Sequence, residues 1–164
     1  MLQVQTTIVP KKLPNVVDSK SLFHMLFGTD TICNQRKGAL PVDECAVIAC
    51  YADKTGKIKR LIACDVAFAN SAGAALSAMS PADANHATKA RQLAENVLEN
   101  LSEVMNVAVN LFIESFGARL ELVSVNRLSE LTPEAKDALS SSQRVKMEIT
   151  IPKYDQGKVD LIAV

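Results

Sequence analysis

Hydrophobic and polar positions alternate along much of this chain, and the spacing of the apolar residues separates strands from helices. The apolar runs 44–52 and 57–66 flank a D-K-T-G turn sequence, which predicts a β-hairpin. Residues 144–151 alternate almost strictly, and residues 157–164 follow them after a short turn. This second pair predicts another hairpin, with one buried face and one wet face.

The other elements follow from capping residues and turn formers. We expect a short helix at residues 16–28, capped by Asp18 or Ser19 and ended by Gly28, and a loop at residues 29–43. The remaining short elements are a small-residue helix at 67–79, a strand at 119–125 and a helix at 133–139 capped by Thr132. This order of elements predicts one α+β domain over residues 1–164, with residues 1–15 as an extended arm or an edge strand.

The longest predicted element begins at Ser80, a helix cap, followed by Pro81 at the first helical position. Nothing breaks a helix from there to about Ser115, and Gly117 then ends it. A helical repeat places one apolar stripe on this segment, made of Ala90, Leu93, Val97, Leu101, Val104, Ala108 and Leu111. We expect this stripe to be buried against the sheet.

The opposite face of the same helix is polar. Within an arc of about 60° it carries Gln92, Glu99, Glu103, Asn106 and Asn110. A solvated face explains this pattern. A surface for a protein partner explains it as well, because asparagine is poor inside a helix and apolar residues (Val107, Val109 and Ile113) flank the two asparagines.

Composition removes several function classes. The formal net charge is zero and there is no tryptophan, so the chain lacks both the basic patch and the stacking platform that nucleic-acid binding needs. The first twelve residues do not form a signal peptide, and the longest apolar stretch, around residues 45–52, is too short to cross a bilayer. We therefore expect a cytoplasmic protein without a membrane partner.

The four cysteines, Cys33, Cys45, Cys50 and Cys64, form no C-x-x-C pair, and His24 and His86 are far apart in the sequence. We interpret the thiols as reduced apolar side chains and expect no metal site. No Ser/His/Asp set and no glycine-rich phosphate loop is evident. An enzyme acting on a small molecule is therefore the weakest interpretation.

The step Glu103-Val104-Met105-Asn106 resembles the E-x-x-N motif of the CheC/CheX/FliY family of chemotaxis phosphatases. The order of elements around it is also similar, from about Val16 to the C-terminus. The resemblance implies a CheX-like domain, in which a mainly antiparallel sheet packs against two long helices. It also implies that the substrate is a phosphorylated aspartate on a CheY-like response regulator.

In that family the asparagine places the attacking water and the glutamate forms a salt bridge to a lysine of the regulator. The resemblance therefore assigns these roles to Asn106 and Glu103. Glu99 and Asn110 share the polar face of the helix, and we expect them to be partner-binding residues. The Mg²⁺ belongs to the regulator, so no cofactor is expected in this chain. One motif instead of two implies the single-site CheX-like arrangement, whose members form homodimers.

A second interpretation keeps the fold without the reaction. The family often has Asp or Ser four residues before its glutamate, where this chain has Glu99, and Pro133 comes later than the proline that usually follows the motif. Asn110 stands near the place of a family glycine. These departures favour a catalytically silent CheX-like module for binding or dimerisation in a two-component signalling pathway.

Overall fold

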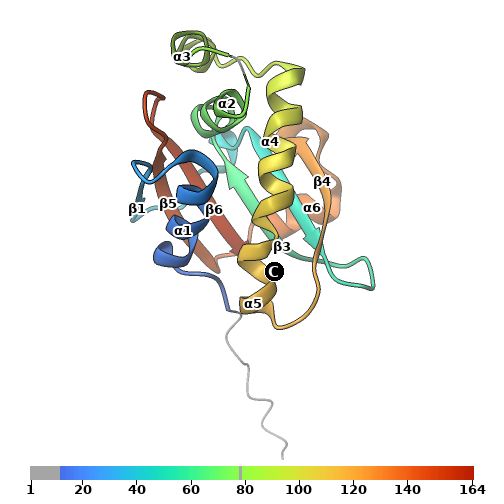
Figure 1. Ribbon diagram of the computed structural model, residues 1–164. Helices are drawn as coiled ribbons and strands as arrows, with labels where there is room; N and C mark the ends of the chain where they lie inside the picture. Colours follow the sequence, from blue (N-terminus) through green and yellow to red (C-terminus); the bar gives the residue numbers. More distant parts are fainter. Residues whose placement is uncertain (1–11, 78) are drawn as a thin grey trace, which may run out of the picture.

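The computed structural model describes residues 12–77 and 79–164 (Figure 1). Its strands are β1 (Ile32–Gln35), β2 (Val47–Ala52), β3 (Ile58–Cys64), β4 (Glu121–Arg127), β5 (Arg144–Thr150) and β6 (Gly157–Ala163). Its helices are α1 (Val16–Phe27), α2 (Val66–Ala75), α3 (Pro81–Lys89), α4 (Glu95–Ala108), α5 (Asn110–Phe116) and α6 (Pro133–Leu139), with single 3-10 turns at η1 (Val42–Glu44) and η2 (Leu128–Glu130). The expected α+β class is confirmed. Most of the expected N-terminal arm, residues 1–11, lies outside the described residues.

The six strands form one sheet in the order β1-β5-β6-β3-β2-β4, and every neighbouring pair is antiparallel. Both predicted hairpins are confirmed as β2–β3 and β5–β6. Helices α1, α2, α4 and α5 cover one face of the sheet, and α6 covers the other (Figure 1). Within the described residues, no helix is long and apolar enough to cross a membrane.

The central sheet is buried on both faces. All six residues of β2 are buried; Val47 and Tyr51 pack toward α4, whereas Ile48 packs toward α6. The single wet face predicted for the second hairpin is wrong, because Asp160 of β6 is fully buried on the α6 side. Residues 36–45 and α6 cover this face, and the alternation along β5 alone does not show which other segments pack against it.

Helix α1 is capped by a side chain at its N-terminus and by a glycine at its C-terminus. Its N-cap is Asn15, whose side chain accepts a hydrogen bond from the Asp18 amide at 2.8 Å, while the Asp18 carboxylate reaches back to the Asn15 amide. The predicted cap at Asp18 or Ser19 is therefore wrong by three to four positions, because Asp18 is the third helical residue, whose side chain completes a capping box with Asn15. Gly28 ends the helix as predicted, at φ 100°.

The loop predicted at residues 29–43 contains the edge strand β1. Only Cys33 of its four residues is buried, so the strand has too short an alternation to be recognised from its own sequence. It forms because its backbone pairs with β5, where Cys33 lies opposite Ile149. Pairing with a strand more than a hundred positions away is a tertiary effect.

The single helix predicted from Ser80 to Ser115 is wrong: the segment forms α3, α4 and α5. The chain leaves the helical path after α3, where Arg91 adopts φ 54°. Two side chains from other elements hold the linker open. Asn70 Nδ2 donates to the Gln92 carbonyl at 2.9 Å, and Arg127 Nη2 donates to the Leu93 carbonyl at 2.9 Å.

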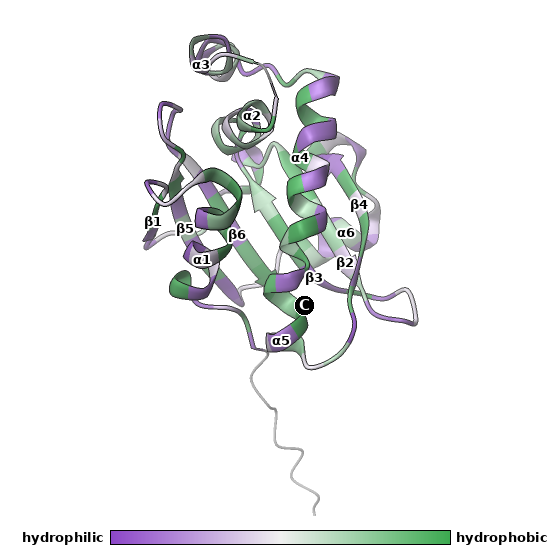
Figure 2. Cartoon of the chain, viewed as in Figure 1, coloured by the Kyte–Doolittle hydropathy of each residue, from purple (hydrophilic) through white to green (hydrophobic). Residues whose placement is uncertain are grey.

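The predicted apolar stripe survives where it lies on a helix. Its α4 members Val97, Leu101, Val104 and Ala108 are all buried, and Leu111 is buried in α5. The earliest two members, Ala90 and Leu93, lie in the linker instead, and Ala90 is exposed. Hydrophilic and hydrophobic residues alternate along α4 in Figure 2, as expected of a helix with one buried side.

Helices α2 and α4 approach each other at Gly73. A Cβ atom added there would lie 2.5 Å from the Val97 carbonyl oxygen, which is backbone and cannot rotate away. We therefore expect Gly73→Ala to lower the free energy of unfolding, measured by urea denaturation, by about 1–3 kcal/mol. Gly38→Ala is the matched control, since nothing lies within 4 Å of its added Cβ atom. Equal stability of the two variants would contradict this packing.

Candidate functional site

Glu103 and Asn106 lie side by side on the outer surface of α4. Both are exposed, while the two residues between them, Val104 and Met105, are each only 1% exposed. The three-residue spacing puts the carboxylate and the amide on neighbouring turns of one helix face. Among the described residues, neither side chain takes part in a hydrogen bond or an ion pair. Both groups are therefore available to a partner.

The other two predicted site residues have different surroundings. Glu99 is exposed one turn before Glu103, on the same polar stripe. Asn110 belongs to α5, and its Nδ2 donates to the Val107 carbonyl at 3.0 Å across the junction between the two helices. Gln92, which the continuous helix placed on this stripe, lies in the linker before α4. The structure thus brings Glu99, Glu103 and Asn106 onto one helix face and gives Asn110 a local bond to the backbone.

Three side-chain hydrogen bonds tie α4 and the residues leading into it to neighbouring elements. Arg127 of β4 binds the Leu93 carbonyl and forms an ion pair with Glu95 at 2.8 Å. Asn100 Nδ2 reaches the Gly73 carbonyl of α2 at 3.2 Å. The Tyr51 hydroxyl of β2 donates to the Met105 carbonyl at 2.6 Å. These contacts give the exposed pair a rigid platform.

Tyr51 and Arg127 had no functional signal in the sequence. Tyr51 stands inside an apolar run, and Arg127 follows a predicted strand, so each looked like an ordinary strand residue. A hydroxyl or guanidinium group on a buried strand residue needs a hydrogen-bond partner, and this requirement is the one indication that the sequence contained. The identity of those partners depends on where α4 crosses the sheet.

The helical segment that carries the pair is acidic. Between Glu95 and Phe116 the chain has four glutamates and no lysine, arginine or histidine. Ile113 of α5, seven positions after Asn106, is a large hydrophobic residue that remains 41% exposed. An acidic helical segment with an exposed apolar side chain is suited to a protein partner that presents a lysine.

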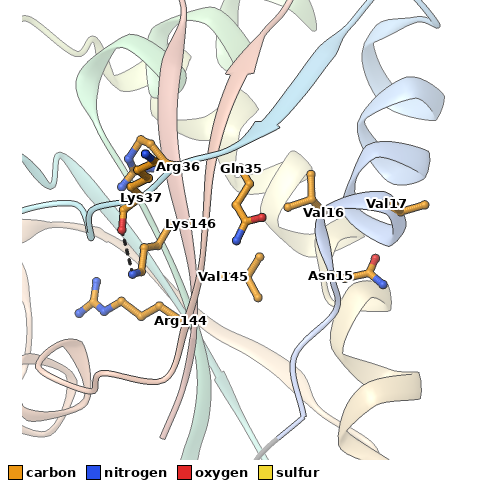
Figure 3. Close-up of a pocket in the computed structure, with 9 residues that line it drawn as sticks. All are labelled: Asn15, Val16, Val17, Gln35, Arg36, Lys37, Arg144, Val145 and Lys146. Atoms are coloured by element: carbon orange, nitrogen blue, oxygen red, sulfur yellow. Dashed lines mark hydrogen bonds between the residues drawn. The ribbon is translucent and has the colours of Figure 1, made fainter.

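Three hollows in the described structure are lined by residues other than Glu103 and Asn106. One of about 800 Å³ is lined by residues of α1, β5 and the end of β1, among them Arg36, Lys37, Arg144 and Lys146 (Figure 3). Its two arginines already pair with the buried Asp160, at 2.8 and 3.1 Å. A hollow of about 570 Å³ includes Asn110 and Glu114 beside α1. The motif face itself is an open helix surface, which favours a macromolecular partner over an enclosed small molecule.

The cysteines and His24 have structural surroundings. All four cysteines are buried and unpaired, and burial raises the pKa of both Cys33 and Cys45 to about 11, which keeps them protonated at neutral pH. His24 lies 2.8 Å, through Nε2, from the Thr31 carbonyl and links α1 to the start of β1. Within residues 12–77 and 79–164, no three His, Cys, Asp or Glu side chains are grouped closely enough to hold a metal ion.

Comparison of the sequence with protein-family models and with curated proteins finds no match. Solved structures do match. The FliM middle domain from H. pylori is 8% identical, with 90% of this chain and 84% of that one covered at a TM-score of 0.58, and FliM in a FliM–SpeE complex gives the same score. CheX in a complex with CheY, BeF3 and Mg²⁺ from Borrelia burgdorferi is 16% identical, with 88% and 92% covered at a TM-score of 0.53.

These comparisons establish the fold. The chain has the architecture shared by CheX and the FliM middle domain, so the fold implied by the sequence resemblance is confirmed. The matching CheX structure from Borrelia burgdorferi is a complex of CheX with CheY. At such low identity the likeness concerns the fold alone, and activity rests on the motif residues of this chain.

Proposed function

We propose that this protein is a phosphatase that hydrolyses the aspartyl-phosphate of a CheY-like response regulator, with Asn106 orienting the attacking water. The observation that carries the proposal is the exposed Glu103/Asn106 pair on a firmly held helix of a CheX-like fold. The presence of CheY in the CheX structure supports the same class of partner.

The reaction needs positioning more than covalent chemistry. The Asn106 amide oxygen accepts a hydrogen bond from water, and its NH₂ group donates to the water or to the phosphoryl group. The water oxygen forms a bond to phosphorus while the bond to the aspartyl oxygen breaks, which releases phosphate and regenerates the carboxylate. The regulator's Mg²⁺ would stabilise the charge on the phosphoryl oxygens, and the role proposed for Asn106 needs no metal ion bound to this chain.

Glu103 holds the two proteins in register through an ion pair with a lysine near the phosphorylated aspartate. Its carboxylate has no cation from the described part of its own chain, so a partner lysine meets no internal competitor. Glu99 extends the negative field one turn further along α4. The proposal includes a homodimer, in keeping with the single-site resemblance.

A catalytically silent binding module is the second candidate. Two FliM structures match with a higher TM-score (0.58) than the CheX–CheY complex does (0.53), and in one of them FliM is in complex with SpeE. Glu99 and the late Pro133 also depart from the phosphatase pattern. In this case the α4 face docks a regulator without accelerating hydrolysis.

The proposal is tested by measuring phosphate release from a panel of Mg²⁺-loaded, phosphorylated single-domain response regulators of the same organism, with and without this protein. We expect faster release from at least one regulator. Binding of a phosphorylated regulator without faster release supports the silent module instead. Neither binding nor acceleration with any member of the panel contradicts both functions.

A further inference from the structure

Tyr51 connects the centre of the sheet to the helix that carries the motif. It lies in β2, is fully buried, and its ring packs at 5.1 Å from that of Phe112, with an interplanar angle of 60°. Its hydroxyl donates to the carbonyl oxygen of Met105 at 2.6 Å. Met105 directly precedes Asn106, so a buried hydrogen bond from the sheet ends one residue from the amide that orients the water.

The position of Asn106 depends on its backbone. Its side chain makes no hydrogen bond with another described residue, so no neighbour corrects a displaced or rotated helix turn. The regular helix of α4 ends at Ala108, and α5 begins at Asn110 after the single junction residue Val109, so Asn106 lies within one turn of an irregularity in the helical path. Among the described residues, the Tyr51 hydroxyl is the side-chain donor from the sheet that reaches the last two turns of α4.

We propose that Tyr51 is a positioning residue for the reaction: its hydroxyl fixes the last turn of α4 so that the Asn106 amide faces the phosphoryl group at the correct distance. This role rests on the proposed phosphatase function. A misplacement of about 1 Å in a positioning group can slow a reaction by up to about 100-fold. Loss of one hydrogen bond that restrains, but does not form, the turn should cost less than that.

The variant Tyr51→Phe removes the hydroxyl and keeps the ring against Phe112. The matched control is Ser71→Ala, because the buried Ser71 hydroxyl of α2 also donates to a main-chain carbonyl, that of Asp155, at 3.1 Å and away from the motif. Each variant loses one buried hydroxyl–carbonyl hydrogen bond. A purely structural role for Tyr51 predicts the same behaviour in both.

We expect Tyr51→Phe to lower kcat for regulator dephosphorylation about tenfold with KM unchanged, and Ser71→Ala to leave both constants within about twofold. In the free protein, hydrogen exchange of the amides from Met105 to Asn110 should become faster in Tyr51→Phe and stay unchanged in Ser71→Ala. The exchange measurement uses no regulator, so it reports on the helix turn whatever the activity.

The two proposals fail in different ways. Wild-type protein that accelerates no regulator overturns the phosphatase function, and the positioning role with it. An active wild type in which Tyr51→Phe keeps its kcat, or shows unchanged exchange, overturns only the role of Tyr51. An equal loss of kcat in Ser71→Ala also overturns it, because the effect then follows general stability.

Discussion

Asn106→Ala is expected to lower kcat for phosphate release from the responsive regulator by about 100-fold or more, because the amide acts on groups that form in the transition state. Affinity for the Mg²⁺- and BeF3-loaded regulator should change little, since BeF3 mimics a phosphoryl group and needs no attacking water. Asn106 is exposed and makes no internal hydrogen bond in the described structure, so the substitution should not unfold the protein. Phosphate release and regulator binding, measured on the same preparations, check this result.

Two further variants separate the roles on this helix. Asn96→Ala changes the same residue type on the same helix, ten residues or about 15 Å away, where Asn96 is also exposed. It should leave kcat unchanged. Glu103→Gln should instead weaken regulator binding and reduce its dependence on salt, because it removes the carboxylate of the intermolecular ion pair.

An Asn106→Ala protein with wild-type kcat would contradict the assignment of the amide, even if the protein is a phosphatase. Equal losses in Asn96→Ala and Asn106→Ala would indicate a damaged helix face. Weakened regulator binding in Asn106→Ala, with unchanged binding in Glu103→Gln, would contradict the binding role assigned to Glu103.

Asp160→Asn is expected to lower the free energy of unfolding by about 3–5 kcal/mol, the usual result of removing one partner from a buried ion pair. The Asp160 carboxylate is fully buried between Arg36 and Arg144 and also accepts the Leu40 amide at 2.9 Å. Without its charge, both guanidinium groups remain largely buried with no described counter-charge, at 10% and 7% side-chain exposure. Urea denaturation followed by circular dichroism measures the loss.

Asp137→Asn is the control for this variant, because Asp137 is an exposed acid on α6. It should change stability by no more than about 0.5 kcal/mol. A loss below about 1 kcal/mol in Asp160→Asn would show that the hydrogen bonds from both arginines to backbone carbonyls, rather than the charge pairs, hold this part of the sheet.

The motif was predictable from the sequence because its reasons are local. Glu103 and Asn106 stand three positions apart on a helix, and Val104, Leu101 and Val97 beside them set which side is buried. Helical periodicity over 14 residues is enough to orient such a face. The side chains that hold this helix in place were not predictable, because the donors to the Met105 and Leu93 carbonyl groups come from β2 and β4.

The sequence-based predictions that the structure corrects fail for a common physical reason, namely contacts between elements that are not neighbours in the sequence. A continuous helix from Ser80 was the best local solution, since no proline or glycine interrupts it, yet Asn70 and Arg127 compete for its carbonyls and break it. Strand β1 is too short to be recognised alone and exists because β5 offers an edge. A wet face was expected for β5–β6 because the alternation along β5 does not show that residues 36–45 and α6 pack against it.

The sequence by itself determined the α+β class, the two hairpins, several helix ends (Gly28, Ser80, Gly117 and Thr132) and the outward pair Glu103/Asn106, because capping, turn chemistry and periodicity act over a few neighbouring residues. Only the tertiary structure decided where the long helical segment breaks and which strands form the edges of the sheet. It also decided that the buried Asp160 pairs with two arginines and that the buried Tyr51 donates to the Met105 carbonyl. Tyr51 and Met105 are 54 positions apart. Contacts over such separations depend on how whole elements pack, and no local pattern encodes them.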